Sequence, residues 1–264
     1  MEKMLMKSRK SIILFLILTF ILSSICYFIY INFGKSASGI TALLMWCPGL
    51  SAIIVRNIFY KKEKVFGFGK CNGKFIVMSI LIPMLYLGVS YGLYWAINPA
   101  AFTGQVYSNS IGLMIYAFFS SILTAMGEEI GWRGFLLPKM SERFHYKYAV
   151  IICGLIWAAW HYPLMFAGLY QAGTPVYYQI PMFTVEVVLM TAILGYLRMN
   201  SGNIWPAILL HASHNYFDQM ICGPLTKADK SVYYVGETGF LTVIFVLVIT
   251  VFLYRKNRKK SPNL

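Results

Sequence analysis

Long apolar runs, separated by short polar segments, follow one another along almost the whole chain. A helix that crosses a bilayer needs about 20 predominantly apolar residues, and the pattern reaches this length repeatedly. The predicted fold class is therefore all-α, a polytopic membrane helix bundle that forms a single transmembrane domain over residues 1–264. We expect about eight transmembrane helices, at roughly residues 12–33, 40–60, 75–98, 111–137, 148–168, 180–198, 203–221 and 238–254.

The composition agrees with this pattern. Hydrophobic residues make up 58% of the 264 residues and charged residues only 12%, which is about half the charged fraction of ordinary globular domains. Such a chain leaves no segment for a soluble domain of ordinary size. The sequence contains no internal repeat and no glycine-rich phosphate loop, which disfavours a nucleotide-driven pump.

The net charge of +14 raises the question of a nucleic-acid partner, and the positions of the basic residues answer it. All but three of the 23 Lys and Arg residues lie in segments that would face one side of the membrane; the exceptions are Lys35, Lys227 and Lys230. By the positive-inside rule this side is the cytoplasm. We therefore expect both termini to be cytoplasmic, in a multi-pass protein of a bacterial-type cell membrane whose partners are the lipid bilayer and no nucleic acid.

Polar groups interrupt three of the predicted spans. An ionisable side chain inside a span costs roughly 2.5–3.5 kcal/mol on insertion scales and usually faces the bundle interior, where it marks a functional site. The groups are Glu128, Glu129 and Arg133 in the fourth span, His161 in the fifth, and His211, His214 and Asn215 in the seventh.

These groups are expected to lie at similar depths. Counted from the basic residue at the inner end of each helix, Glu128, His161 and His211 lie about 16, 21 and 20 Å along the helix axis. Because the hydrocarbon core is about 30 Å thick, all three approach its middle. We expect them to converge on one wet pocket.

The spacing within each helix separates the two glutamates. Glu129 and Arg133 are four positions apart and can pair along one helix face, whereas Glu128 is turned by about 100° and is free to face the pocket. His211 and Asn215 also share one face. We interpret Glu129 and Arg133 as a supporting pair and Glu128 as the carboxylate that is available for chemistry.

A buried glutamate beside imidazole and carboxamide groups can hydrolyse a bond with activated water. Glu128 would act as the general base on a water molecule, while His161, His211 and Asn215 would orient that water and stabilise an oxyanion. No serine or cysteine lies in a setting that offers a nucleophile with an adjacent base, so covalent catalysis is disfavoured.

Zinc is the chemical alternative. His161, His211 and a carboxylate would suit Zn²⁺ with an open position for water, but the HExxH pattern is absent. We favour a metal-free glutamate mechanism and retain Zn²⁺ as the competing cofactor.

The three motifs, taken in order, resemble the CPBP family, which comprises the type II CAAX prenyl proteases and bacteriocin-processing and immunity proteins. They are EExxxR at 128–133, an aromatic-xxx-His at 157–161 and HxxxN at 211–215. The resemblance covers roughly residues 110–220, which we take as a CPBP-like catalytic core. In the second motif, Trp157 stands where the family usually has Phe.

The resemblance implies an intramembrane endopeptidase that cuts a peptide bond in a membrane-associated peptide or protein. In the eukaryotic relative the substrate is a prenylated C-terminal tail; a peptide signal, a bacteriocin leader or the tail of a membrane protein is equally compatible here. By position, the resemblance implies that Glu128 activates the water, His161 is its partner, His211 and Asn215 form the oxyanion side, and Glu129 and Arg133 support them.

Other interpretations compete with an enzyme. A non-enzymatic bacteriocin-immunity or scaffolding protein could use the same fold, although every polar residue of the motifs is present. A proton-coupled transporter could use midplane Glu and His residues, although no inverted repeat is evident. The stretch from Glu128 to Arg133 could also be a solvated charged loop, with the helix ending at Met126.

Two further residues carry expectations of their own. Glu186, a carboxylate within the sixth span, is expected to pair with a cation or polar group, and the alternative is that it lines the substrate path. His214 lies outside the motif pattern, and we expect a hydrogen-bonded interior or lipid-facing side chain.

Overall fold

Helices account for the regular structure of the described chain. The computed structural model describes residues 2–34, 39–108 and 110–258, and within these ranges the only β contact is an isolated bridge between Phe102 and Thr226. The predicted all-α class is confirmed. The longer helices are α1 (Glu2–Phe33), α2 (Ile40–Phe59), α3 (Gly73–Ile97), α4 (Ile111–Glu129), α6 (Tyr146–Phe166), α7 (Val176–Ser201), α8 (Trp205–Tyr216) and α9 (Phe240–Arg258).

Short helical pieces complete the described chain. Two of them are π-helices that extend longer helices: η3 (Ile130–Leu136) follows α4, and η4 (Phe217–Cys222) follows α8. The others are α5 (Leu137–Ser141) and the 3₁₀ turns η2 (Pro99–Ala101) and η5 (Lys230–Tyr233).

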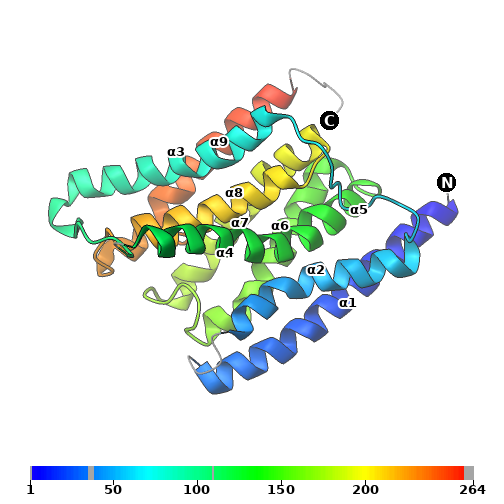
Figure 1. Ribbon diagram of the computed structural model, residues 1–264, viewed down its shortest axis with the longest axis horizontal. Helices are drawn as coiled ribbons and strands as arrows, with labels where there is room; N and C mark the ends of the chain where they lie inside the picture. The colour runs from blue at the N-terminus through cyan, green and yellow to red at the C-terminus, as the bar shows by residue number, and fades with distance from the viewer. Residues whose placement is uncertain (1, 35–38, 109, 259–264) are drawn as a thin grey trace.

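Neighbours in the bundle are often distant in sequence (Figure 1). Helices α1 and α2 pack as a pair, α2 borders α4, α4 borders α8, and α8 borders α3. Helices α6, α7 and α9 pack against one another in this order, and α7 also contacts α8 and η3. The segments that carry the predicted site residues therefore lie next to one another in the interior.

Within the described ranges, six helical segments are long and apolar enough to cross a membrane. The chain is thus a multi-pass membrane protein, as predicted. The expected spans at 203–221 and 238–254 are not among the six; they fold as α8 with η4 and as α9, and the full count of about eight stays a prediction. Polar side chains such as His211 and Asp218 reduce the apolar character of the first of these two segments. The six are Leu5–Phe33, Ile40–Phe59, Gly73–Ile97, Ile111–Ser141, Tyr146–Phe166 and Val176–Ser201.

The two ends of the described chain lie at the same end of the bundle. Helix α1 begins at the right of Figure 1, and α9 rises from lower left to upper right toward the same end of the bundle. Helix α1 starts at Glu2 rather than near residue 12, so the basic residues that precede the apolar run are helical too. Lys35, Lys259 and Lys260, which enter the charge pattern, lie outside the described residues.

Helices α2 and α4 approach so closely that glycine is required where they cross. A Cβ on Gly127 would lie 2.8 Å from the carbonyl oxygen of Met45, and a Cβ on Gly131 would lie 2.5 Å from the Cβ of Pro48. Such distances leave no space for a side chain. The crossing therefore holds α4 against α2 at the level of Glu128.

The helix continues through the charged stretch instead of ending at Met126. Helix α4 passes into the π-helix η3 and then into α5, and every residue of η3 is buried. The interpretation of this stretch as a solvated loop is therefore wrong, because the side chains of Glu128, Glu129 and Arg133 lie in the interior. π-Helical turns of this kind are frequent at functional sites.

We expect Gly131→Ala to lower the thermal stability of the purified protein in detergent. The added methyl group would overlap Pro48, and overpacking of this kind costs about 1–3 kcal/mol. Gly92→Ala in α3 is the matched control, because a Cβ at Gly92 meets no atom within 4 Å. Equal melting temperatures for the two variants would contradict the close crossing.

Candidate active site

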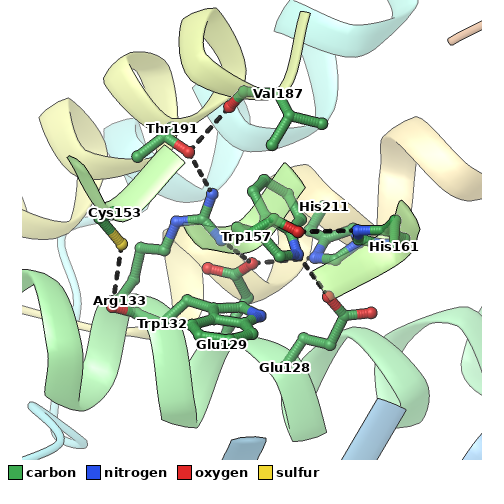
Figure 2. A network of polar contacts seen from close by, with 10 residues as sticks. All are labelled: Glu128, Glu129, Trp132, Arg133, Cys153, Trp157, His161, Val187, Thr191 and His211. Atoms are coloured by element: carbon green, nitrogen blue, oxygen red, sulfur yellow. Dashed lines mark hydrogen bonds and ion pairs between the residues drawn. The ribbon is translucent and has the colours of Figure 1, made fainter. Parts of the chain in front are cut away.

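A buried ion pair joins four elements of the bundle (Figure 2). Arg133 Nη1 of η3 donates to Glu129 Oε1 of α4 at 2.9 Å, and both side chains are fully buried. The same oxygen accepts a hydrogen bond from His211 Nδ1 of α8 at 2.9 Å. Arg133 Nη2 donates to Thr191 Oγ1 of α7 at 3.0 Å. The pairing predicted from the i, i+4 spacing is confirmed.

Trp157 of α6 connects this ion pair to Glu128. The guanidinium carbon of Arg133 lies 3.8 Å from the centroid of the Trp157 ring, and the indole Nε1 donates to Glu128 Oε2 at 2.7 Å. The Glu128 carboxylate lies on the side of the two histidines, apart from the ion pair. Phenylalanine has no donor, so the tryptophan in the second motif adds a hydrogen bond that the usual residue cannot make.

His161 has a defined ring orientation. Its Nδ1 lies 3.0 Å from the carbonyl oxygen of Trp157; because a carbonyl oxygen only accepts, Nδ1 carries the proton and Nε2 of the neutral ring is an acceptor. Aromatic rings pack around it, with centroid distances of 4.7 Å to Trp160 and 5.1 Å to both Tyr170 and Phe183. This packing limits the ring to one orientation.

A cavity of about 530 Å³ collects the predicted residues. Glu128, His161, His211 and Asn215 all line it, although they come from three helices. The structure thus brings together the groups whose predicted depths are similar, while their catalytic roles stay predictions. The side chain of Asn215 has no hydrogen-bond partner within the described ranges, so its carboxamide is available to a molecule in the cavity.

The structure adds Glu237, which the sequence pattern does not single out. It lies in the loop before α9, lines the same cavity, accepts hydrogen bonds from the Tyr170 hydroxyl and from Gln219 Nε2, and lies 3.8 Å from His214 Nε2. Burial alone would raise the pKa of Glu237, but the positive charge of a protonated His214 ring 3.8 Å away, together with the hydrogen bond from Tyr170, outweighs burial and lowers this pKa to about 2. Glu237 stands in a short polar loop, and no pattern in the sequence predicts that its side chain is buried.

His214 and Glu186 also line the cavity. His214 Nδ1 is hydrogen-bonded to the Tyr86 hydroxyl, which confirms the expected hydrogen-bonded interior side chain. The expected pairing of Glu186 with a cation or polar group is wrong: its Oε1 is buried without a hydrogen-bond partner among the described residues. Helix α7 turns Glu186 toward the cavity. There its ionisable neighbours are two other carboxyl groups, those of Glu237 and Asp218.

The described residues do not form a ligand set for zinc. No three His, Cys, Asp or Glu side chains are grouped as metal ligands in the part of the chain that the structure describes. A catalytic zinc site uses three protein ligands and an open position for water. His161 and His211 each use Nδ1 in a hydrogen bond to the protein, which leaves Nε2 of each ring as the nitrogen that could bind a metal ion; a third ligand grouped with them is missing among the described residues.

Two comparisons with known proteins bear on this site. Residues 110–217 match the family described as type II CAAX prenyl endopeptidase Rce1-like. A protein named CAAX prenyl protease 2, from Methanococcus maripaludis, is 28% identical over 266 residues, which cover 92% of this chain and 93% of the relative. The segment matched by the family contains Glu128, His161, His211 and Asn215.

The apolar helices, the polar cavity within them and these matches define the chain as an intramembrane protease, a hydrolase that cuts peptide bonds inside a polypeptide. The family match and the similarity to the Methanococcus protein confirm the resemblance to the CPBP family. The substrate of the chain is accordingly a membrane-associated polypeptide.

Arg133→Met is expected to destabilise the protein by about 3–5 kcal/mol, because it leaves Glu129 as an uncompensated buried charge. Adding Glu129→Gln should restore most of the loss, since a neutral amide oxygen still accepts from His211 Nδ1. Thermal unfolding of the wild type, both single variants and the double variant in detergent measures the coupling. Losses that simply add in the double variant would show that the two side chains do not interact.

Proposed function

We propose that the chain hydrolyses its substrate with a water molecule activated by Glu128, without a metal ion. The observation that carries this proposal is that two adjacent glutamates differ in their hydrogen-bond partners. Glu129 is occupied by Arg133 and His211, whereas Glu128 accepts one hydrogen bond, from Trp157, and lines the cavity. A general base needs a lone pair within reach of the proton that it removes, and this requirement favours Glu128.

In the proposed reaction a water molecule lies between Glu128 and His161. The carboxylate of Glu128 takes one proton from the water while the water oxygen attacks the carbonyl carbon of the peptide bond. His161 Nε2 accepts the second hydrogen bond of the water and orients it, because its Nδ1 is committed to the Trp157 carbonyl oxygen. The proton then passes from Glu128 to the amide nitrogen as the carbon–nitrogen bond breaks.

Asn215 and His211 are proposed to stabilise the oxyanion of the tetrahedral intermediate. They lie one turn apart on α8 and both line the cavity. Asn215 Nδ2 supplies a neutral donor, and His211 Nε2 is a second donor when the ring carries both protons. The hydrogen bond to Glu129 holds the His211 ring in place before substrate binds, which is the preorganisation that this form of catalysis requires.

The proposed substrate is the membrane-proximal segment of a peptide or protein. Most of the cavity wall is apolar or aromatic and is formed by helices of transmembrane character. The name of the Methanococcus relative makes a prenylated CAAX tail the first substrate to test. From the positive-inside pattern we propose cytoplasmic termini and a cell-membrane location.

We expect Glu128→Gln to lower kcat/KM by at least about 10²-fold, because the isosteric amide cannot accept a proton. The measurement is cleavage of membrane-proximal peptides, with a prenylated CAAX peptide among them, by purified protein in detergent with and without a strong zinc chelator. Glu63→Gln is the matched control, since Glu63 pairs with Lys7 on the exposed surface. The wild type and the control should cleave equally with and without chelator.

The outcomes separate the competing interpretations. Full activity of Glu128→Gln would remove Glu128 from the mechanism. Loss of wild-type activity in chelator, with recovery on adding Zn²⁺, would replace the metal-free mechanism with a zinc mechanism. An unchanged biological phenotype in cells that carry Glu128→Ala would favour an immunity or scaffolding protein.

Asn215→Ala is expected to lower kcat by about 10²–10³-fold with little change in KM, as for other oxyanion donors. Steady-state kinetics on the peptide cleaved by the wild type provides the test. Asn200→Ala is the control, because Asn200 is exposed near the end of α7 and bonds only to the Tyr196 carbonyl oxygen among the described residues. A raised KM with unchanged kcat would mean that Asn215 binds substrate without stabilising the oxyanion.

A further inference from the structure

The cavity wall carries more carboxyl groups than the proposed mechanism uses. Besides Glu128, it includes Glu186 and Glu237, three histidines, and no Lys or Arg among the described residues. Asp218 of η4 is buried nearby and accepts a hydrogen bond from the Tyr91 hydroxyl at 2.8 Å. Carboxylates in apolar surroundings are costly unless a partner compensates their charge.

The protein itself supplies partners to only some of these carboxyl groups. Glu237 has the hydroxyl of Tyr170, the amide of Gln219 and the ring of His214 around it. Glu186 is 2% exposed, and its Oε1 has no hydrogen-bond partner within the described ranges. A buried carboxylate that lines a cavity and has no donor of its own is suited to a donor carried by a ligand.

These groups adjoin the residues of the proposed mechanism. His214 follows His211 by three positions on α8, about 4.5 Å further along the helix axis. Tyr170, which donates to Glu237, packs on the ring of His161 at 5.1 Å. An extended peptide advances about 3.3 Å per residue, so a residue close to the scissile bond would reach them.

We propose that Glu186 and Glu237, with His214, form an acidic subsite that binds a cationic nitrogen of the substrate close to the scissile bond. This proposal rests on the proposed function, since it names the side chain that the endopeptidase selects. The nitrogen belongs to a Lys side chain or to the free amino terminus of a peptide. A cationic nitrogen would give Glu186 the partner that it lacks, a positively charged hydrogen-bond donor. An apolar or acidic residue of the substrate would leave this carboxylate unpaired.

Binding to the Glu128→Gln variant tests the acidic subsite without requiring cleavage. N-acetylated peptides that differ at one position, scanned through the sequence with Lys, norleucine or Glu, are titrated into the detergent-solubilised protein. At one position, Lys should bind at least about tenfold more tightly than norleucine, and Glu more weakly than either. Peptides with a free amino terminus distinguish an α-amine from a Lys side chain as the bound group.

Adding Glu186→Gln should reduce this Lys preference to less than about threefold. Glu186→Leu is a second variant that removes the carboxylate and replaces it with an apolar side chain, so it keeps the test valid where the glutamine variant folds poorly. Glu63→Gln in the same background should retain the full preference. Equal affinities for Lys and norleucine at every position, and for free and acetylated amino termini, would overturn the acidic subsite.

Failure of the acidic subsite and failure of the proposed function give different results. If the wild type cleaves peptides and Glu128→Gln does not, but no cation preference exists, the endopeptidase mechanism stands and the acidic subsite is wrong. If the cation preference is present and depends on Glu186, although the wild type cleaves none of the peptides, the acidic subsite stands as a peptide-binding site without the proposed hydrolysis.

Discussion

The buried ion pair of Glu129 and Arg133 is the interaction on which the rest of the site depends. Two charges removed from water are costly unless they pair with good geometry and gain further hydrogen bonds. Here His211 and Thr191 supply further partners, and the Trp157 ring covers the guanidinium. Glu129 Oε2 and Arg133 Nε have no hydrogen-bond partner among the described residues. Because the partners that the pair does have come from α6, α7 and α8, satisfying the charges of α4 and η3 also fixes the positions of the helices that line the cavity.

The same network explains how two adjacent glutamates come to differ. Successive residues of a helix point about 100° apart, so Glu129 can face Arg133 while Glu128 faces the cavity. Trp157 makes the two environments interdependent, since its ring contacts Arg133 and its Nε1 holds Glu128 Oε2. The supporting pair and the proposed base therefore belong to one packed unit. Within it, Glu129 accepts hydrogen bonds from Arg133 and His211, whereas Glu128 accepts one, from Trp157.

Much of this arrangement could be predicted from the sequence, because it depends on helix periodicity and span length. The Glu129–Arg133 pair follows from an i, i+4 spacing, and the approach of His161 and His211 follows from their depths along apolar helices. Glu186 and Glu237 could not be placed in this way. The direction of Glu186 depends on the rotation of α7 in the bundle, and the burial of Glu237 depends on a loop that folds over the cavity, and neither leaves a periodic signal.

Hydrolysis inside a membrane protein requires water where the surrounding helices exclude it. A cavity lined by ionisable and amide groups can hold water because those groups need hydrogen-bond partners that the apolar wall does not provide. The unpaired oxygen of Glu186 and the free carboxamide of Asn215 have the same need. When a polypeptide enters, its own donors and acceptors must replace that water. Its affinity therefore depends on how well it pairs these groups, so the polarity that admits the attacking water also selects the substrate.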